Sequence, residues 1–168
     1  GLRVDVIAGD YEGVAALTPP PNSWAAESAN EVTILLIRLG DGGEFRLPRA
    51  KGQVNRTLYF FEGRELSLNG VKVADRTGYH LEAQSELELK GGAGGAQLLL
   101  LQAKPIGEPT FQHGPFVMNS RDDIIRTIQD YQRTQFGGWP WARHDMIHGP
   151  TIERFAKYPD GRVEKPKV

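Results

Sequence analysis

Histidines are the first residues to weigh, because their side chains bind metal ions and transfer protons near neutral pH. His144 and His148 are four residues apart, with Asp145 between them. On a helix this spacing would place two imidazoles on one face, as in many metal sites. Prolines and a glycine crowd the segment, however, and no third ligand is evident. We therefore expect no native metal ion at this pair.

Two other histidines could act as pocket bases. His113 precedes a predicted helix, and His80 lies in the segment Gly-Tyr-His-Leu at residues 78–81. A proton relay would need a serine or carboxylate partner, and none is evident near either histidine. We interpret both as structural residues that hydrogen-bond the backbone. The sequence contains no nucleophile–base pair or carboxylate pair of plausible geometry, so we predict no catalytic and no cofactor-binding residues.

The glycine cluster at residues 91–95 could be taken for a phosphate-binding loop. Such a loop requires a helix N-terminus behind it, so that free amides and the helix dipole meet the anion. Here an apolar, strand-like run follows at 97–101, and no Gly-Lys-Ser/Thr motif is present. We therefore predict a hairpin turn at these glycines.

Composition excludes several classes of protein. The 168 residues include no cysteine, which rules out disulfides, thiolate metal sites and a cysteine nucleophile. Twenty basic and 21 acidic side chains nearly cancel, so neither nucleic acid nor an anionic membrane is a favoured partner. No secretory signal or membrane-spanning run is visible. We expect a cytoplasmic protein, and the start at Gly1 without methionine suggests a fragment that lacks an N-terminal partner.

Most of the chain has the pattern of β-structure. Asn69-Gly70 separates two short strands and suits a type I′ hairpin turn. Residues 9–21 are predicted to be a loop. Short strands separated by glycine and proline are typical of an antiparallel sandwich or barrel. The predicted strands are 2–7, 32–39, 44–48, 65–68, 71–73, 86–89 and 97–101.

One α-helix is predicted at about residues 120–136. Ser120 can cap its N-terminus, two aspartates suit the first turn, and Gly137 ends it. The helix carries an apolar stripe, and aromatic residues flank it. These side chains could contact a partner or could form internal core, and the pattern alone leaves both possibilities open. The interface candidates are Phe116, Ile124, Ile128, Tyr131, Phe136, Trp139 and Trp141.

Several short segments of the sequence resemble segments of a known protein family. Residues 113–120, His-Gly-Pro-Phe-Val-Met-Asn-Ser, are similar to the pirin C-terminal region, as is Gly-Gly-Trp-Pro at 137–140. Leu-Tyr-Phe-Phe-Glu-Gly at 58–63 resembles a phrase found in many cupin barrels. Residues 4–9 and 97–109 resemble other parts of the second pirin domain. The resemblance covers most of the chain up to about Gly138.

The resemblance implies an all-β fold: a cupin-type antiparallel barrel or sandwich (a double-stranded β-helix) with one appended C-terminal helix. It would span residues 1–138, followed by an extended tail at 139–168 that packs on the barrel or on a partner. Pirins resemble a pair of cupin barrels, of which the first holds iron through three histidines and one glutamate. Some members show quercetin dioxygenase activity, and the mammalian member is linked to transcriptional co-regulation.

The chain departs from the cupin metal motif at the matching place. Residues 52–59 read Gly-Gln-Val-Asn-Arg-Thr-Leu-Tyr, without histidine, and Arg56 would repel a cation. We therefore expect no metal or other cofactor in this chain, although a pirin-like parent would hold iron or a similar metal in its first barrel.

From this resemblance we expect a structural, partner-binding half that closes against a missing N-terminal cupin barrel or self-associates. One alternative is that the chain is part of a quercetin 2,3-dioxygenase-like iron enzyme. Another is a binding module for a small apolar ligand.

Overall fold

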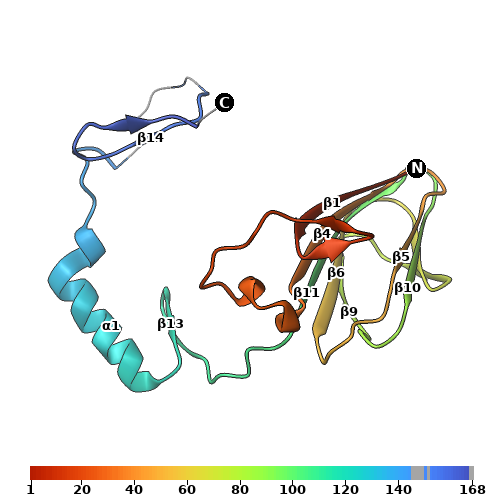
Figure 1. The fold of residues 1–168 in the computed structure, drawn as a ribbon, viewed down its shortest axis with the longest axis horizontal. Coiled ribbons are helices and arrows are strands. Elements are labelled where there is room, and N and C mark those ends of the chain that lie inside the picture. The colour runs from red at the N-terminus through yellow and green to blue at the C-terminus, as the bar shows by residue number, and fades with distance from the viewer. Residues whose placement is uncertain (145–149, 151, 167–168) are drawn as a thin grey trace. The chain divides into compact units, whose positions relative to one another are not determined.

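A computed structural model describes residues 1–144, 150 and 152–166 of the chain. The chain divides into two compact units, Gly1–Ile106 and Gly107–Val168. The first unit contains the two larger β-sheets, and the second contains the α-helix (Figure 1). The domain boundary predicted from the sequence, near residue 138, stays a prediction.

The first sheet of the N-terminal unit has five antiparallel strands in the order β1-β4-β11-β6-β9. These strands are β1 (Leu2–Ala8), β4 (Thr33–Leu39), β6 (Asn55–Gly63), β9 (Thr77–Leu81) and β11 (Ala96–Ala103). Along β4, buried residues alternate with half-buried ones, as expected for a strand with one face toward a core.

The second sheet has four antiparallel strands in the order β5-β10-β7-β8. They are β5 (Glu44–Leu47), β7 (Leu66–Leu68), β8 (Val71–Val73) and β10 (Leu87–Gly91). β5 and β10 alternate strictly between exposed and buried residues. One face of this sheet is therefore in the core, and the other is in solvent.

The hairpin predicted at Asn69 and Gly70 is confirmed. Both residues have a positive φ, 47° and 79° respectively, which a type I′ turn requires at its two central positions. The Asn69 side chain also accepts a hydrogen bond from the backbone N–H of Glu88, at 2.7 Å. This contact ties the turn to the neighbouring strand β10.

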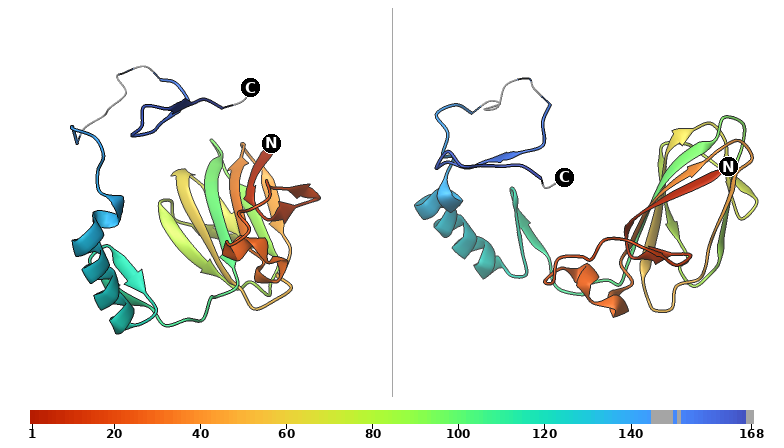
Figure 2. Two further views of the ribbon diagram at one scale, coloured as in Figure 1. Left: turned by 60° about the vertical axis from the view of Figure 1, so that its left-hand side comes forward. Right: turned by 45° about the horizontal axis from the view of Figure 1, so that its top comes forward.

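The hydrophobic core lies between the two sheets, which face each other in the N-terminal unit (Figure 2). Nine large side chains in it are less than 2% exposed, so the interior is filled by the protein itself. The prediction of an antiparallel, all-β fold with one appended helix is confirmed. The nine side chains are Leu35, Ile37, Phe45, Leu58, Phe60, Leu66, Leu89, Leu98 and Leu100.

The segment predicted as a loop at residues 9–21 contains a short antiparallel pair, β2 (Asp10–Tyr11) and β3 (Val14–Ala15). Two 3₁₀ turns follow, η1 (Trp24–Ala26) and η2 (Ser28–Asn30). Two-residue strands are too short to show an alternation of apolar and polar residues, so this pair could not be predicted from the sequence pattern.

The hairpin predicted at residues 91–95 is wrong. β10 belongs to the four-stranded sheet and β11 to the five-stranded one, so this segment crosses between the sheets. At this crossing, glycines allow the backbone to pass close to the backbone of neighbouring segments. The Gly91 N–H donates to the Gly43 carbonyl at 2.9 Å. Gly95 has φ +74°, and a Cβ on it would lie 2.3 Å from the carbonyl oxygen of Leu39.

The predicted helix is confirmed as α1 (Arg121–Thr134). Ser120 caps it, since its Oγ accepts the backbone N–H of Asp123 at 3.1 Å. The Ser120 hydroxyl also donates to the Asp123 carboxylate, and this bond, with one from Arg126, holds the pKa of Asp123 below its ordinary value. None of the described helices is long and apolar enough to cross a membrane.

The rest of the C-terminal unit consists of short elements. The hairpin β12–β13 precedes the helix and packs against it, and a 3₁₀ turn, η3, follows (Figure 1). A second small hairpin, β14–β15, lies near the C-terminus. These elements are β12 (Phe111–His113), β13 (Phe116–Met118), η3 (Gln135–Gly137), β14 (Ala156–Lys157) and β15 (Val163–Glu164).

Candidate functional site

The place that matches the cupin metal motif is occupied by Arg56. This residue lies on β6, where Arg56, Leu58 and Phe60 are buried and alternate with more exposed residues. Side chains at alternate positions of a strand share a face, so Arg56 points between the sheets with the core residues. Only 3% of its surface is exposed. A guanidinium therefore lies between the two sheets, in the segment where the resemblance led us to expect metal ligands.

Hydrogen bonds from two segments hold this guanidinium. Its Nε donates to the Oε1 atom of Gln102 on β11 at 2.8 Å, and its Nη2 donates to the Pro48 carbonyl at 3.0 Å. The third nitrogen, Nη1, is buried and has no hydrogen-bond partner among the described residues. Burial lowers the pKa of Arg56, and the charge of Glu31 opposes this shift. Arginine nevertheless stays protonated in proteins, so the buried group is a cation.

Glu31 completes the polar end of the barrel. Its backbone is left-handed, with φ 46°, and its carboxylate accepts the backbone N–H groups of Lys51 and Gly52. Its carbonyl oxygen accepts a hydrogen bond from the Gln102 side chain at 3.3 Å. The Glu31 carboxylate is thus bound by backbone amides, and its effect on Arg56 is one of charge rather than of direct contact.

This arrangement places a buried positive charge at one end of the barrel. Among the described residues, no group of three or more His, Cys, Asp or Glu side chains could hold a metal ion. The sequence identified Arg56 as incompatible with a cation but did not reveal Gln102 or Glu31. Gln102 is 46 residues from Arg56, and only the pairing of β6 with β11 brings Arg56 opposite it.

The histidine pair considered as a metal site is only partly described. His144 stacks on Trp139, with ring centroids 6.4 Å apart and ring planes 20° apart. His148 and Asp145 lie outside the described residues.

The other two histidines are exposed. His80 on β9 lies with its Nδ1 3.1 Å from the Thr57 hydroxyl on β6. It therefore bonds a side chain, rather than the backbone partner that we expected. His113 ends strand β12 with an exposed side chain.

Three of the interface candidates form an aromatic cluster within the C-terminal unit, and two more lie on α1. Phe116 lies 5.8 Å from Tyr131 and 6.1 Å from Phe136, and the latter two rings are 5.2 Å apart, all measured between ring centroids. Ile124 is buried, and Ile128 is half-buried. The apolar stripe of α1 thus packs on its own hairpin, although Tyr131 and Phe136 remain 41% and 60% exposed.

The two tryptophan candidates contact residues of the tail. Trp139 donates from Nε1 to the Arg143 carbonyl at 2.7 Å, yet 52% of its surface is exposed. Trp141 is half-buried, and the ammonium of Lys157 lies 5.8 Å from the centroid of its ring. The structure therefore gives these two rings separate local contacts.

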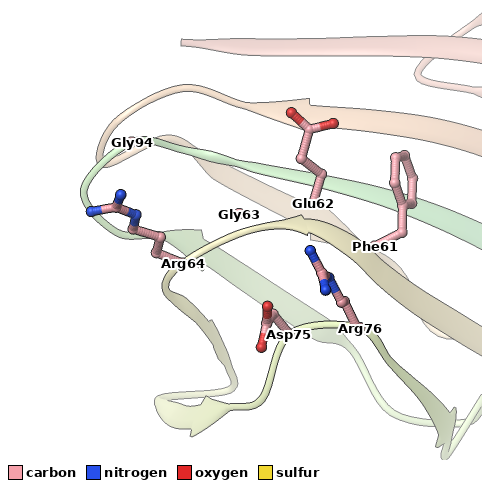
Figure 3. A pocket seen from close by; sticks show the side chains of 7 residues that line it. All are labelled: Phe61, Glu62, Gly63, Arg64, Asp75, Arg76 and Gly94. Atoms are coloured by element: carbon pink, nitrogen blue, oxygen red, sulfur yellow. The ribbon is translucent and has the colours of Figure 1, made fainter.

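A shallow surface hollow of about 340 Å³ lies where β6 ends (Figure 3). The Arg76 side chain reaches toward Glu62 and Phe61, whereas Arg64 points away from them. The lining of this hollow mixes cationic and anionic groups and includes no histidine. The lining residues are Phe61, Glu62, Gly63, Arg64, Asp75, Arg76 and Gly94.

Comparison with known protein families identifies one matching domain. The pirin C-terminal cupin domain matches residues 34–137. This range contains most of the two sheets and the whole of α1.

Two curated proteins show how this chain relates to longer ones. A protein of Arabidopsis thaliana named as pirin-like is 54% identical over 159 residues, which cover 86% of this chain and 51% of the relative. A protein of Pseudomonas aeruginosa named as a candidate quercetin 2,3-dioxygenase is 35% identical over 136 residues, covering 79% of this chain and 45% of the relative. The chain thus spans about half the length of these relatives.

A solved structure has the same fold. The crystal structure of a quercetin 2,3-dioxygenase from Acinetobacter baumannii superposes with a TM-score of 0.68 at 24% identity, covering 82% of this chain and 44% of the other. At this identity the likeness concerns the fold alone. The predicted cupin-type architecture is confirmed.

Proposed function

Because this chain belongs to the pirin family, whose C-terminal cupin domain matches residues 34–137, we propose that it is the metal-free, partner-binding half of a two-barrel protein. The observation that carries the proposal is the buried guanidinium of Arg56 at the place of the cupin metal motif. The chain matches only about half the length of its relatives, which supports the idea that the complete protein has two barrels.

Charge is the reason that this barrel would exclude a metal. Arg56 is held by a side-chain amide and a backbone carbonyl, both neutral groups, so nothing in direct contact cancels its charge. In the weakly polarisable interior, repulsion between this cation and a divalent ion would be far stronger than in water. The neighbouring inward side chains, Leu58 and Phe60, offer no ligand atoms.

Elemental analysis of the chain purified from iron-supplemented culture tests the metal-free part of the proposal. We expect well under one iron, nickel or copper per chain. A stoichiometric metal lost on Glu31→Ala or Gln102→Ala would overturn the proposal, because these polar side chains lie near Arg56 at the inner end of the barrel. A metal lost only on His144→Ala or His148→Ala would instead belong to the tail and leave the barrel metal-free.

The names of the relatives favour a second function for the complete protein. One relative is named as a candidate quercetin 2,3-dioxygenase, and the superposed crystal structure is of an enzyme with that activity. In such an enzyme this half would shape or close the site of the other barrel. Iron-dependent dioxygenation needs a fixed ligand set with open positions. We expect this chain with added Fe²⁺ to oxidise quercetin no faster than free Fe²⁺ does. Faster turnover would overturn the assignment of the reaction site to the other barrel.

Binding of a small apolar ligand between the sheets is less well supported. The interior is filled by large side chains such as Phe45 and Phe60, and a ligand there would have to displace them. The hollow of Figure 3 is on the surface and is lined mainly by charged groups.

A further inference from the structure

The turn between β7 and β8 places a side-chain amide next to a backbone nitrogen that no side chain shields. Asn69 and Gly70 are the two central residues of this turn, and both are exposed. A Cβ built on Gly70 would meet no atom within 4 Å, so the space around this residue is open. Of the five asparagines in the sequence, only Asn69 is followed by glycine. The backbone nitrogen of Gly70 can therefore approach the side-chain carbonyl carbon of Asn69 without steric hindrance.

The N–H group of Gly70 is also free to lose its proton. The pairing of β7 with β8 joins Leu68 to Val71, and the turn residues lie outside this ladder. Among the described residues, no hydrogen-bond acceptor contacts the Gly70 N–H. Because no protein group holds this proton, hydroxide in the surrounding water can remove it, which makes the nitrogen a nucleophile.

The hydrogen bonds of the Asn69 side chain favour attack on its carbonyl carbon. The Oδ1 atom accepts the backbone N–H of Glu88 at 2.7 Å. When a nitrogen adds to an amide carbonyl, negative charge develops on the oxygen, and a backbone N–H at this distance stabilises that charge. The Nδ2 atom donates to the Glu86 carbonyl at 3.4 Å, which is a long and weak hydrogen bond. The oxygen that gains charge is thus well held, and the nitrogen that must leave is not.

We propose that Asn69 is a site of spontaneous covalent modification, at which the chain converts this asparagine to aspartate and isoaspartate. The deprotonated Gly70 nitrogen forms a bond to Cγ of Asn69. The bond from Cγ to Nδ2 then breaks, and Nδ2 takes protons from water and leaves as ammonia. The product is a five-membered cyclic imide.

Water opens this imide at either of its two carbonyl carbons. Cleavage of the bond between Cγ and the Gly70 nitrogen gives aspartate. Cleavage of the bond between that nitrogen and the backbone carbonyl carbon of residue 69 gives isoaspartate, in which the main chain runs through the former side chain. The whole conversion consumes one water and releases one ammonia, so it needs no oxidant, reductant or cofactor.

Isoaspartate would weaken the attachment of this hairpin to the four-stranded sheet. The Asn69 N–H donates to the Glu88 carbonyl at 2.8 Å, so together with the two side-chain bonds this residue makes three hydrogen bonds to residues 86–88. A main chain lengthened by one carbon atom cannot keep all three. β8 is at the edge of the sheet and pairs with β7, whose Leu66 is only 1% exposed. Loosening the turn therefore gives water access to the core at this edge.

Ageing of the purified chain at 37 °C and about pH 8 tests the site. Peptide mass spectrometry measures the exchange of amide for carboxyl at each asparagine, and chromatography separates isoaspartyl from aspartyl peptides. Asn22 is the internal reference, because it is exposed and is followed by serine. The test variant is Gly70→Asp, since aspartate tolerates a left-handed backbone but adds a side chain beside the attacking nitrogen.

We expect Asn69 to be modified at least tenfold faster than Asn22, and Gly70→Asp to slow the modification of Asn69 at least tenfold. The rate should rise with pH, because hydroxide removes the proton from the Gly70 nitrogen. Modification of Asn22 before Asn69 would overturn the proposal, and this comparison within the native chain does not depend on whether the variant folds. An unchanged rate in a folded Gly70→Asp chain would also overturn it.

Hydrogen exchange tests the structural consequence. Isoaspartyl chains, separated from unmodified chains by ion exchange, should exchange the backbone amide hydrogens of β7 and β8 at least tenfold faster. The amides of β4 in the other sheet are the control and should exchange at the same rate in both forms. Equal exchange of β7 and β8 in the two forms would show that the inferred loosening of the hairpin is wrong.

Discussion

At the scale of single residues, Arg56 links segments that are far apart in the chain. It bonds Gln102 and Pro48, and Gln102 in turn bonds Glu31. These contacts join the start of β6 to β11 and to the loops at that end of the barrel. In a metal-bearing cupin the ligands would connect such segments through the ion. Here a guanidinium makes connections between them, at the cost of burying a charge.

Two substitutions separate the bonds of Arg56 from its charge. Lysine keeps the charge but cannot reproduce the two directed bonds, whereas methionine removes both. We expect Arg56→Lys to lower the free energy of unfolding by about 1–3 kcal/mol, the cost of unsatisfied buried polar groups. Arg56→Met should cost less, because no buried charge remains. Urea denaturation monitored by circular dichroism measures the free energy of unfolding of both variants. A larger decrease for Arg56→Met would mean that the charge itself stabilises the fold through Glu31.

The sequence predicted this site only in part. Arg56 stood out because a basic residue replaces the expected imidazoles within one short segment. Its partners could not be identified, because Gln102 and Glu31 reach it through strand pairing and loop conformation rather than through nearby sequence. The same limit applies to the order of the strands in the two sheets. Alternation indicates which residues share one face of a strand, but not which strands are neighbours.

At the scale of elements, strands and the helix were predicted well where local signals are strong. The Asn69-Gly70 turn and the Ser120 cap depend on neighbouring residues alone, and both are confirmed. The error at residues 91–95 has a different origin. Glycines allow a left-handed backbone equally in a hairpin and in a crossing between sheets. The choice between them depends on which strands β10 and β11 pair with, and that is decided by long-range contacts.

The crossing between the sheets predicts a contrast between two adjacent glycines. Gly94 and Gly95 both have a positive φ, 84° and 74°, but only Gly95 lies against backbone, that of Leu39 and Gly40. Gly94→Ala should cost about 1–2 kcal/mol of stability, the strain of a left-handed alanine. Gly95→Ala should cost clearly more, because its Cβ would meet the Leu39 carbonyl. Equal midpoints of urea unfolding for the two variants would contradict the close approach.

Ion pairs on the four-stranded sheet predict sensitivity to acid. Hydrogen bonds from Lys90 and Lys72 hold the pKa values of Glu44 and Glu65 below their ordinary value. A carboxyl with a lowered pKa stabilises the fold above its unfolded pKa and loses that contribution as the pH falls through its folded pKa. The melting temperature should therefore decrease as the pH is lowered below about 4.

The double variant Glu44→Gln/Glu65→Gln isolates this contribution. Its melting temperature should depend less steeply on pH in the acid range, and at pH 7 it should differ little from the native chain because exposed pairs contribute little. Glu86→Gln is the control, since Glu86 has no ion-pair partner among the described residues. An unchanged acid slope in the double variant would show that other carboxyls dominate the transition.

At the scale of the whole molecule, nearly all of the buried apolar surface belongs to one unit. Among the described residues, Ile124 is the only buried hydrophobic side chain in Gly107–Val168, and all the others lie in Gly1–Ile106. The end of β11 is also secured within the first unit, because the Lys104 N–H donates to the Asn30 carbonyl at 2.8 Å. Independent folding requires enough buried apolar surface to offset chain entropy, and the first unit has it.

Truncation tests this distribution of the core. A chain of residues 1–106 should keep its β-sheet circular dichroism and unfold cooperatively in urea, with a midpoint close to that of residues 1–138. Residues 107–168 alone should be largely unfolded, because a 14-residue helix is marginal in water without a packed core. If residues 1–138 fold and residues 1–106 do not, the hairpin β12–β13 and α1 are integral to the barrel. The domain boundary near residue 138, as predicted from the sequence, would then describe the folding unit.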